Sequence, residues 1–232
     1  MPMREIQPSG QGRGASVASV RPVSRDRERY RVFTARNMDE IPQLRRVPAD
    51  LRFAMRVLAT VLPFRVNSYF VNEVIDWQRV PDDPMFRLIF PQPGMLAEAQ
   101  FDRVADLLRR QVTGPELDAV VHDIRLQLNP HPAGQLEMNR PDDGGEPLDG
   151  LQHKYRETLL YFPKAGQTCH AYCTFCFRWA QFVGDTDLRM AAEHRRLHAY
   201  LAEHPEVTDL LVTGGDPMIM KTRRLEQTLA PL

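Results

Sequence analysis

The hydrophobic pattern of this 232-residue chain changes its period at about residue 157, and this change constrains the fold more than any other feature. Two short, mostly apolar runs, at 158–163 and 208–213, are each followed by a loop and then by a helical pattern. Such runs are typical of buried strands, and strand, loop and helix in repeated order form the unit of a parallel α/β sheet. Because a βαβ unit takes about 30 residues or more, the stretch from 157 to 232 has room for about two βα units.

The stretch from about 37 to 130 carries a helical pattern instead. Its first apolar stripe stops at Pro63, which a helix does not easily continue through. The residues of this stripe, at i, i+4, i+7 and i+11, are Leu51, Met55, Leu58 and Leu62. Another helix is expected to start near Pro115, since proline favours the first helical turn, and a third is expected around 97–110. We therefore expect a small helical domain over residues 30–130.

Two further segments lack the apolar residues needed for a core of their own. Residues 1–29 are rich in Arg, Ser, Gly and Pro, and they are predicted to form a disordered tail. Residues 131–156 carry several prolines and glycines and are predicted to form a turn-rich linker. The domain starting at 157 would then be the beginning of an α/β sheet or barrel that the chain leaves truncated.

Charge and composition argue against several classes of partner. The chain has 30 basic and 30 acidic side chains, so neither a nucleic acid nor a membrane surface is expected as a partner. No apolar run approaches the 18 residues or so of a membrane-spanning helix. The N-terminus lacks the apolar region of a secretory signal, and three unpartnered thiols suit a reducing compartment, so a cytoplasmic location is expected.

All three cysteines of the chain lie within eight residues, in a C-x3-C-x2-C spacing after the first predicted strand. They are Cys169, Cys173 and Cys176. Ligands of α/β sheets bind outside the carboxyl ends of the strands, so this position suits a binding site. Three thiolates could hold a [4Fe–4S] cluster and leave one iron open for a small molecule. One alternative is a zinc site completed by His170, although His170 is adjacent to Cys169 and adjacent residues rarely share one tetrahedral centre. The other alternative is a set of core cysteines that bind no metal.

The cysteine spacing, with Phe175 just before the last cysteine, resembles the signature of radical S-adenosylmethionine (SAM) enzymes. One βα unit later, Gly214, Gly215 and Asp216 resemble the glycine-rich motif of the same enzymes. The resemblance implies that the three thiolates ligate a [4Fe–4S] cluster and that Phe175 lies against the adenine of SAM. It also implies that Gly214, Gly215 and Asp216 hold the amino group of SAM's methionine portion.

Four segments in order resemble the N-terminal portion of the lysine 2,3-aminomutase family, from roughly residue 70 to the end. They are residues 83–91, 150–155, 176–178 and 213–217. The resemblance implies an α/β fold, a partial radical-SAM (β/α) barrel of two βα units preceded by a small α-helical domain. It also implies an isomerase that moves an amino group between adjacent carbons of an amino acid, using a 5′-deoxyadenosyl radical and pyridoxal phosphate (PLP). A reductant such as flavodoxin or ferredoxin would be a partner. Whether the chain forms a homo-oligomer is left open.

Two further residues take roles from this resemblance. Arg178 matches an arginine that pairs with the substrate carboxylate, a contact that suits a planar guanidinium. Lys154 falls where relatives have a basic residue near the PLP phosphate. Arg178 could instead be solvated or face a phosphate. Lys154 could instead be an exposed lysine without a ligand. No catalytic residue is assigned from the sequence.

The chain also departs from the family pattern. Trp179 and Ala180 stand where further arginines are common, and Thr158 stands where an arginine near the phosphate is expected. No lysine of the chain matches the family's Schiff-base lysine. A PLP-independent radical SAM enzyme, or an inactive truncated iron–sulfur or metal-binding fragment, therefore remains an alternative.

Overall fold

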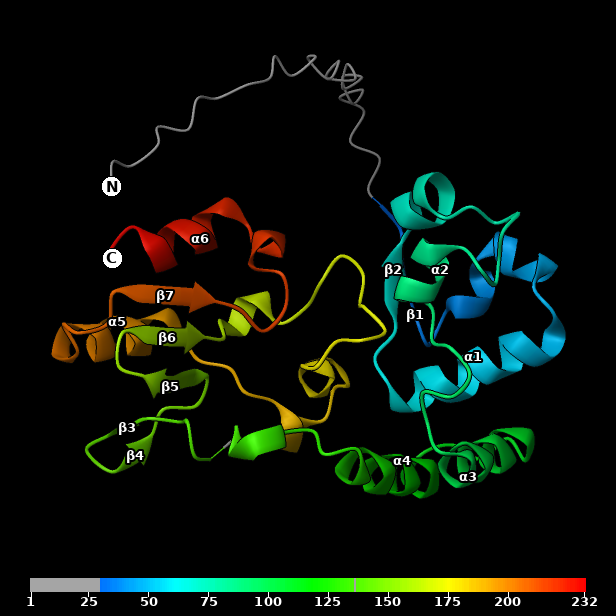
Figure 1. The fold of residues 1–232 in the computed structure, drawn as a ribbon, viewed down its shortest axis with the longest axis horizontal. Helices are drawn as coiled ribbons and strands as arrows, with labels where there is room; N and C mark the ends of the chain where they lie inside the picture. Colours follow the sequence, from blue (N-terminus) through cyan, green and yellow to red (C-terminus); the bar gives the residue numbers. More distant parts are fainter. Residues whose placement is uncertain (1–29, 136) are drawn as a thin grey trace, which may run out of the picture.

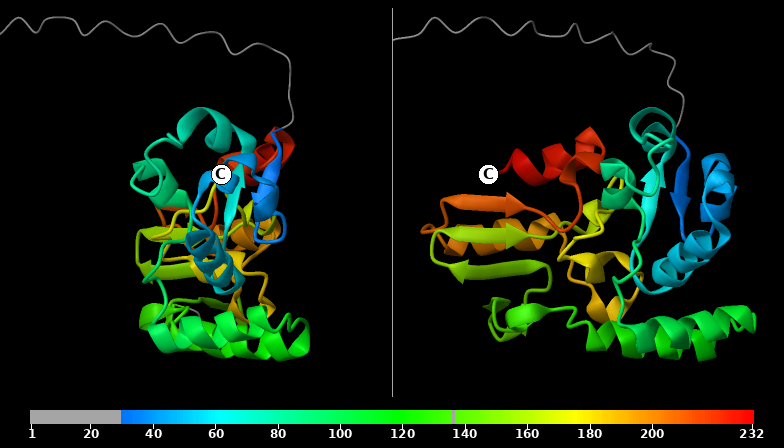
Figure 2. Two further views of the ribbon diagram at one scale, coloured as in Figure 1. Left: turned by 90° about the vertical axis from the view of Figure 1, so that its right-hand side faces the viewer. Right: turned by 45° about the vertical axis from the view of Figure 1, so that its right-hand side comes forward.

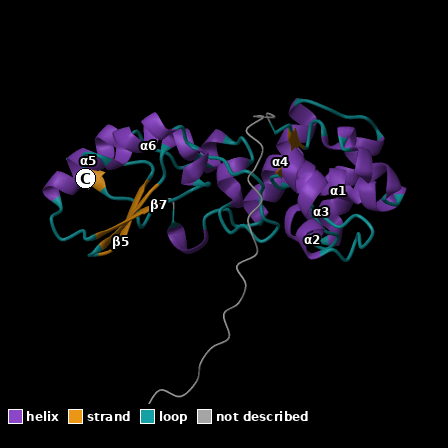
Figure 3. Ribbon diagram, turned by 90° about the horizontal axis from the view of Figure 1, so that it is seen from above, coloured by secondary structure: helices purple, strands orange, loops and turns teal. Residues whose placement is uncertain are grey.

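The computed structural model describes residues 30–135 and 137–232. An N-terminal helical part and a C-terminal α/β part lie side by side, and the cysteine segment, yellow in Figure 1, runs between them. The same arrangement is visible after rotation in Figure 2 and from above in Figure 3. The site can therefore draw on residues from both parts.

The helical part confirms the helices expected from the apolar period. They are α1 (Ala49–Val61), α3 (Glu98–Arg109) and α4 (Pro115–Gln127). The part also contains α2 (Pro84–Ile89) and an antiparallel pair formed by β1 (Val32–Thr34) and β2 (Arg65–Asn67). Neither α2 nor the two strands were predicted from the sequence, because elements of six and three residues are too short to show a hydrophobic period.

Helix α1 packs against two separate apolar clusters, one on each of two faces. Met55 and Ala59 face the first cluster, which contains the stacked rings of Phe86 and Phe90. Val57 and Leu58 face the second cluster, formed with α3 and α4. Since α1 is buried against both groups, the helical part has a core of its own.

The α/β part is built on a three-stranded sheet in the order β5–β6–β7. Its strands are β5 (Leu151–Tyr155), β6 (Thr158–Tyr161) and β7 (Asp209–Val212). Strands β6 and β7 are parallel and are connected through α5 (His194–Glu203), while α6 (Thr222–Leu229) follows β7. The predicted parallel βα units are thereby confirmed, and the fold is α/β.

The segment predicted to be a linker differs from the sequence-based expectation. The predicted linker holds a small hairpin, β3 (Asp142–Asp143) with β4 (Glu146–Pro147), and also β5, which pairs antiparallel with β6. Helix α5 begins at His194, and a separate 3₁₀ turn, Thr186–Leu188, precedes it. Within residues 30–135 and 137–232 the sheet is open, which is consistent with the expected partial fold, and a closed barrel is not observed there.

The predicted disordered tail, residues 1–29, lies outside the described residues. In the part of the chain that the structure describes, no helix has the length and apolar character needed to cross a bilayer.

Candidate functional site

The cysteine loop leaves the carboxyl end of β6 and is held by the C-terminal end of α2. The backbone N–H of Thr174 donates to the carbonyl of Leu88 (2.7 Å), and its hydroxyl donates to the carbonyl of Arg87 (2.9 Å). The last carbonyls of a helix have no partner inside the helix, so Thr174 caps α2. The N–H of Tyr172 also donates to the carbonyl of Arg65 in β2 (2.9 Å). The helical part therefore shapes the backbone that carries the cysteines.

The glycine loop after β7 packs directly on the start of the cysteine loop. The backbone N–H of Asp216 donates to the carbonyl of Thr168 (2.8 Å). A Cβ placed on Gly215 would lie 2.2 Å from the Thr168 carbonyl oxygen, and one on Gly214 would lie 2.5 Å from the Gln167 amide. Gly214 also has a φ of +105°, which side chains rarely tolerate. The two motifs recognised in the sequence are thus in contact.

The three thiols differ in exposure, with Cys173 exposed and Cys169 and Cys176 half-buried. Burial raises the pKa of Cys169 to about 11, and the nearby charges of Cys176 and Asp216 add to this effect. Burial also raises the pKa of Cys176. The thiols are therefore close enough to influence one another electrostatically, which would disfavour several thiolates in the absence of a bound cation.

Three thiols on one loop are compatible with the ligand set of an iron–sulfur cluster. Among the described residues, no group of three or more His, Cys, Asp or Glu side chains is arranged to hold a metal ion. A structural zinc ion needs four ligands that converge on one centre. A cluster instead takes one thiolate on each of several irons, so its ligands do not have to meet at a single point.

Phe175 and Arg178 lie close to the thiols but in different environments. The Phe175 ring is 76% exposed on the loop surface. The Arg178 guanidinium lies over the rings of Phe162 (4.5 Å) and Phe177 (4.8 Å), and its Nη1 is buried without a hydrogen-bond partner among the described residues. Burial lowers the pKa of Arg178, whereas Cys176 opposes this change. A buried guanidinium nitrogen without an acceptor is suited to receive a carboxylate.

Lys154 lies at the opposite end of the sheet from the cysteine loop. Strand β5 pairs Tyr155 with Thr158, the first residue of β6, whereas the cysteines follow the last residue of β6. At about 3.3 Å per residue, the length of β6 separates the two ends by roughly 10 Å. Lys154 is exposed, and its Nζ lies 5.5 Å from the centre of the Tyr155 ring. The structure therefore groups Lys154 with Thr158 and not with the thiols.

The loop contains contacts that the sequence did not suggest. Tyr172 stacks on Phe182 with ring centroids 4.6 Å apart, and its hydroxyl lies 3.1 Å from the Thr168 hydroxyl. Trp179 lines a small cavity of about 50 Å³ beside Cys173 and Cys176. The rest of its lining is mainly apolar and comes largely from the helical part: Leu62, Pro63, Ile89, Pro91, Met95 and Thr174. An apolar residue at 179 therefore matches its surroundings.

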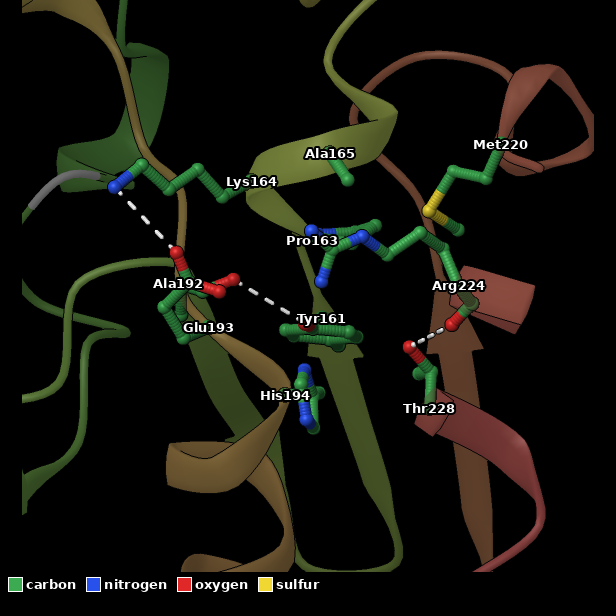
Figure 4. Close-up of a pocket in the computed structure, with 10 residues that line it drawn as sticks. All are labelled: Tyr161, Pro163, Lys164, Ala165, Ala192, Glu193, His194, Met220, Arg224 and Thr228. Carbon is green, nitrogen blue, oxygen red and sulfur yellow. Dashed lines mark hydrogen bonds and ion pairs between the residues drawn. The ribbon is translucent and has the colours of Figure 1, made fainter. Parts of the chain in front are cut away.

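A different cavity, of about 210 Å³, lies beside the carboxyl end of β6 between α5 and α6 (Figure 4). At its edge Lys164 pairs with Glu193 (3.4 Å), and the Tyr161 hydroxyl donates to the Ala192 carbonyl (3.2 Å). None of the cysteines lines this cavity, so it is separate from the thiol site.

Comparison with known proteins finds several relatives whose names all give the same function. No family model matches the chain. A protein of Aquifex aeolicus, provisionally named L-lysine 2,3-aminomutase, is 29% identical over 80% of this chain and 39% of its own length. The L-lysine 2,3-aminomutase of Acetoanaerobium sticklandii is 33% identical over 39% of this chain and 22% of its own length. That of Bacillus subtilis is 22% identical over 86% of this chain and 34% of its own length.

The chain thus spans at most about two fifths of the length of these three relatives. The matches to the Aquifex aeolicus and Bacillus subtilis proteins extend over most of this chain, well beyond the cysteine loop. Together with the α/β fold and the cysteine loop after β6, these similarities support a lysine 2,3-aminomutase-like family for this chain.

Proposed function

We propose that the chain carries the cluster- and SAM-binding part of a radical SAM enzyme of the aminomutase type. The observation that carries this proposal is the contact between the loops that follow the neighbouring parallel strands β6 and β7. The hydrogen bond from Asp216 to Thr168 joins the glycine loop to the residue just before Cys169. Ligands of α/β folds bind at this end of the strands, and the lysine 2,3-aminomutase relatives support the reaction class.

In this proposal Cys169, Cys173 and Cys176 hold a [4Fe–4S] cluster, and the exposed Phe175 ring is available to stack on adenine. The glycine loop offers backbone groups that a ligand can approach closely, because Gly214 and Gly215 have no side chain. When bound, the cluster and SAM supply a 5′-deoxyadenosyl radical, and PLP would carry the migrating amino group.

We further propose that Arg178 binds the carboxylate of an amino acid substrate. Its buried Nη1 has no acceptor among the described residues, so a carboxylate would complete its hydrogen bonds. The rings of Phe162 and Phe177 hold the guanidinium plane in one orientation. Trp179 and the mainly apolar cavity beside it limit access of water to Cys176, which is half-buried.

Anaerobic reconstitution of the chain with iron and sulfide tests the cluster. We expect bound iron and sulfide, an iron–sulfur absorption band and an electron paramagnetic resonance signal that changes when SAM is added. Cys169→Ala, Cys173→Ala and Cys176→Ala should each lose most of the iron. His170→Ala is the matched control, since His170 is exposed and belongs only to the zinc alternative. Zinc at one per chain, or iron that survives the cysteine substitutions, would contradict the proposal.

A second candidate function, a radical SAM reaction without PLP, is favoured by the placement of Lys154. This side chain lies at the amino end of β6 beside Thr158, where relatives are expected to have an arginine. Adding PLP and following its absorbance separates the candidates. If PLP is used, Lys154→Met should weaken its binding while Lys221→Met, at an exposed lysine on another loop, should leave it unchanged. Absence of the absorbance of bound PLP in the wild-type protein would favour the reaction without PLP.

A further inference from the structure

A cavity of about 300 Å³ lies between the helical part and the rear of the cysteine loop. One wall comes from the helical part, and the opposite wall comes from the segment that contains and follows the cysteines. Its lining residues are Thr34, Ala35, Arg36, Ala59, Leu62, Pro63, Phe64, Arg65, Arg125, Tyr172, Phe182 and Val183. Its volume is that of a site for a small molecule.

The lining residues include three arginines and no carboxylate, and Asp185 lies near one of them, Arg125. Arg36 follows β1, Arg65 is the first residue of β2, and Arg125 comes from α4. Strand pairing sets Arg65 opposite Thr34, which brings the Arg36 turn and Arg65 to the same edge of the cavity. No aspartate or glutamate is among the lining residues. Three guanidinium groups on one cavity favour an anionic ligand.

Arg125 is already engaged in holding the fold. Its Nε donates to the carbonyl of Val61 (2.9 Å) and its Nη2 to that of Thr60 (3.3 Å), so it caps the C-terminal end of α1. Burial lowers its pKa, and the nearby charge of Asp185 opposes this change. Arg125 therefore contributes to the potential of the cavity, while its Nε and one N–H of its Nη2 are committed to α1.

Arg36 and Arg65 are free to bind a ligand. Neither forms an ion pair with a carboxylate within the described residues. The Arg65 Nε is buried and lacks a hydrogen-bond partner there. A buried N–H without an acceptor is costly, and an oxyanion in the cavity would satisfy it.

The opposite wall combines aromatic rings with a hydroxyl group. Tyr172 and Phe182 stack with an interplanar angle of 19°, and the Tyr172 hydroxyl lies near the Thr168 hydroxyl. Tyr172 lies in the sequence between Cys169 and Cys173. A ligand in the cavity would thus contact the helical part and the cysteine loop at the same time.

We propose that this cavity is a binding site for a small molecule with a phosphate or carboxylate group, which Arg36 and Arg65 recognise. A guanidinium can donate two parallel hydrogen bonds to either group. The site is separate from the thiols and from Arg178, and it binds its ligand whether or not the cluster is present. Ligand binding fastens the cysteine loop to the helical part through Tyr172.

Calorimetric titration of the chain with inorganic phosphate, and separately with citrate, tests the site at a constant ionic strength set with chloride. We expect saturable binding of at least one of them. Arg65→Met should weaken it about tenfold or more, as expected for the loss of a charged hydrogen bond, and Arg36→Met should also weaken it. The phosphate and citrate arms distinguish a phosphate site from a carboxylate site.

Arg45→Met is the matched control, because Arg45 is exposed and does not line the cavity. Circular dichroism checks that each variant is folded, and Arg65→Lys should restore part of the affinity by restoring the charge. The proposal is overturned if neither anion binds the folded wild-type chain. The expected result for the control Arg45→Met is an unchanged affinity. The proposal is equally overturned if Arg65→Met also binds the anion with the affinity of the wild type.

Discussion

At the scale of single residues, Gly215 explains how two loops can approach so closely. Its backbone conformation is open to other residues, since its φ lies outside the left-handed region. What excludes a side chain is the Thr168 carbonyl oxygen, 2.2 Å from the position of a Cβ. This packing requirement exists without any bound ligand, so the glycine has a structural role alongside its proposed role in binding SAM.

Gly215→Ala should therefore destabilise the chain by about 1–3 kcal/mol, the usual cost of overpacking. Gly166→Ala is the control from the same contact region. There the added Cβ would approach Pro163 Cγ at 3.0 Å and otherwise the flexible side chain of Met220. Urea unfolding followed by circular dichroism measures both variants. Equal losses of stability would contradict the assigned cause.

The exposures of the thiols predict their order of chemical modification. Cys173 is exposed, whereas Cys169 and Cys176 are half-buried. In the metal-free chain, iodoacetamide should alkylate Cys173 first, because the reagent reaches it without any movement of the loop. A time course of peptide mass spectrometry measures the three rates. Faster labelling of Cys169 than of Cys173 would show that the loop has another arrangement in solution.

At the scale of secondary-structure elements, helix α2 has capping groups at both ends. The Asp83 carboxylate accepts a hydrogen bond from the Phe86 N–H (2.7 Å) at the N-terminus, and Asp83 is only 4% exposed. Thr174 caps the C-terminus from the cysteine loop. Since this helix has only six residues, its stability depends on such contacts more than on its own propensity.

Asp83→Ala should lower the free energy of unfolding by about 1–2 kcal/mol through loss of the N-terminal cap. The effect should reach the cysteine loop, because the carbonyls that hold Thr174 belong to the last turn of α2. Asp82→Ala is the matched control, since Asp82 is exposed and lies 3.9 Å from Arg87 in a surface ion pair of little energy. Urea unfolding and hydrogen exchange at Thr174 measure the two effects. Unchanged exchange in Asp83→Ala would argue against the coupling.

At the scale of the whole molecule, His122 of α4 and Asp185 after the cysteine loop join the two parts. The Nδ1–H of His122 donates to a carboxylate oxygen of Asp185 (2.7 Å), whose side chain is 13% exposed. Burial alone would raise the pKa of Asp185. The hydrogen bonds from His122 and the Asp187 amide, with the nearby charges of His122 and Arg125, outweigh burial and lower it.

Because the pKa of Asp185 is lowered in the folded state, its contribution to stability is complete above the ordinary carboxyl pKa of about 3.9 and is lost as the pH falls below it. Asp185→Asn should thus destabilise the chain near neutral pH and differ less from the wild type at about pH 3. Asp187→Asn is the control, since Asp187 is exposed and only its backbone N–H contacts Asp185. Urea midpoints across this pH range measure the difference. A constant difference would contradict the assigned role of the carboxylate.

The sequence by itself determined the elements whose signals are local. The apolar period located α1, α3 and α4, the continuous apolar runs located β6 and β7, and the two motifs were expected at the carboxyl ends of neighbouring parallel strands. These signals rest on residues a few positions apart, where period and capping act.

Only the tertiary structure decided which distant residues meet these elements. Thr174 caps a helix through Arg87, which lies 87 positions earlier in the chain, and β5 joins the sheet from a segment expected to be a linker. The same long-range packing sets Lys154 at the far end of β6 and gathers Arg36, Arg65 and Arg125 around one cavity. Such contacts leave no periodic trace in the sequence, because they depend on how the helical part packs against the cysteine loop.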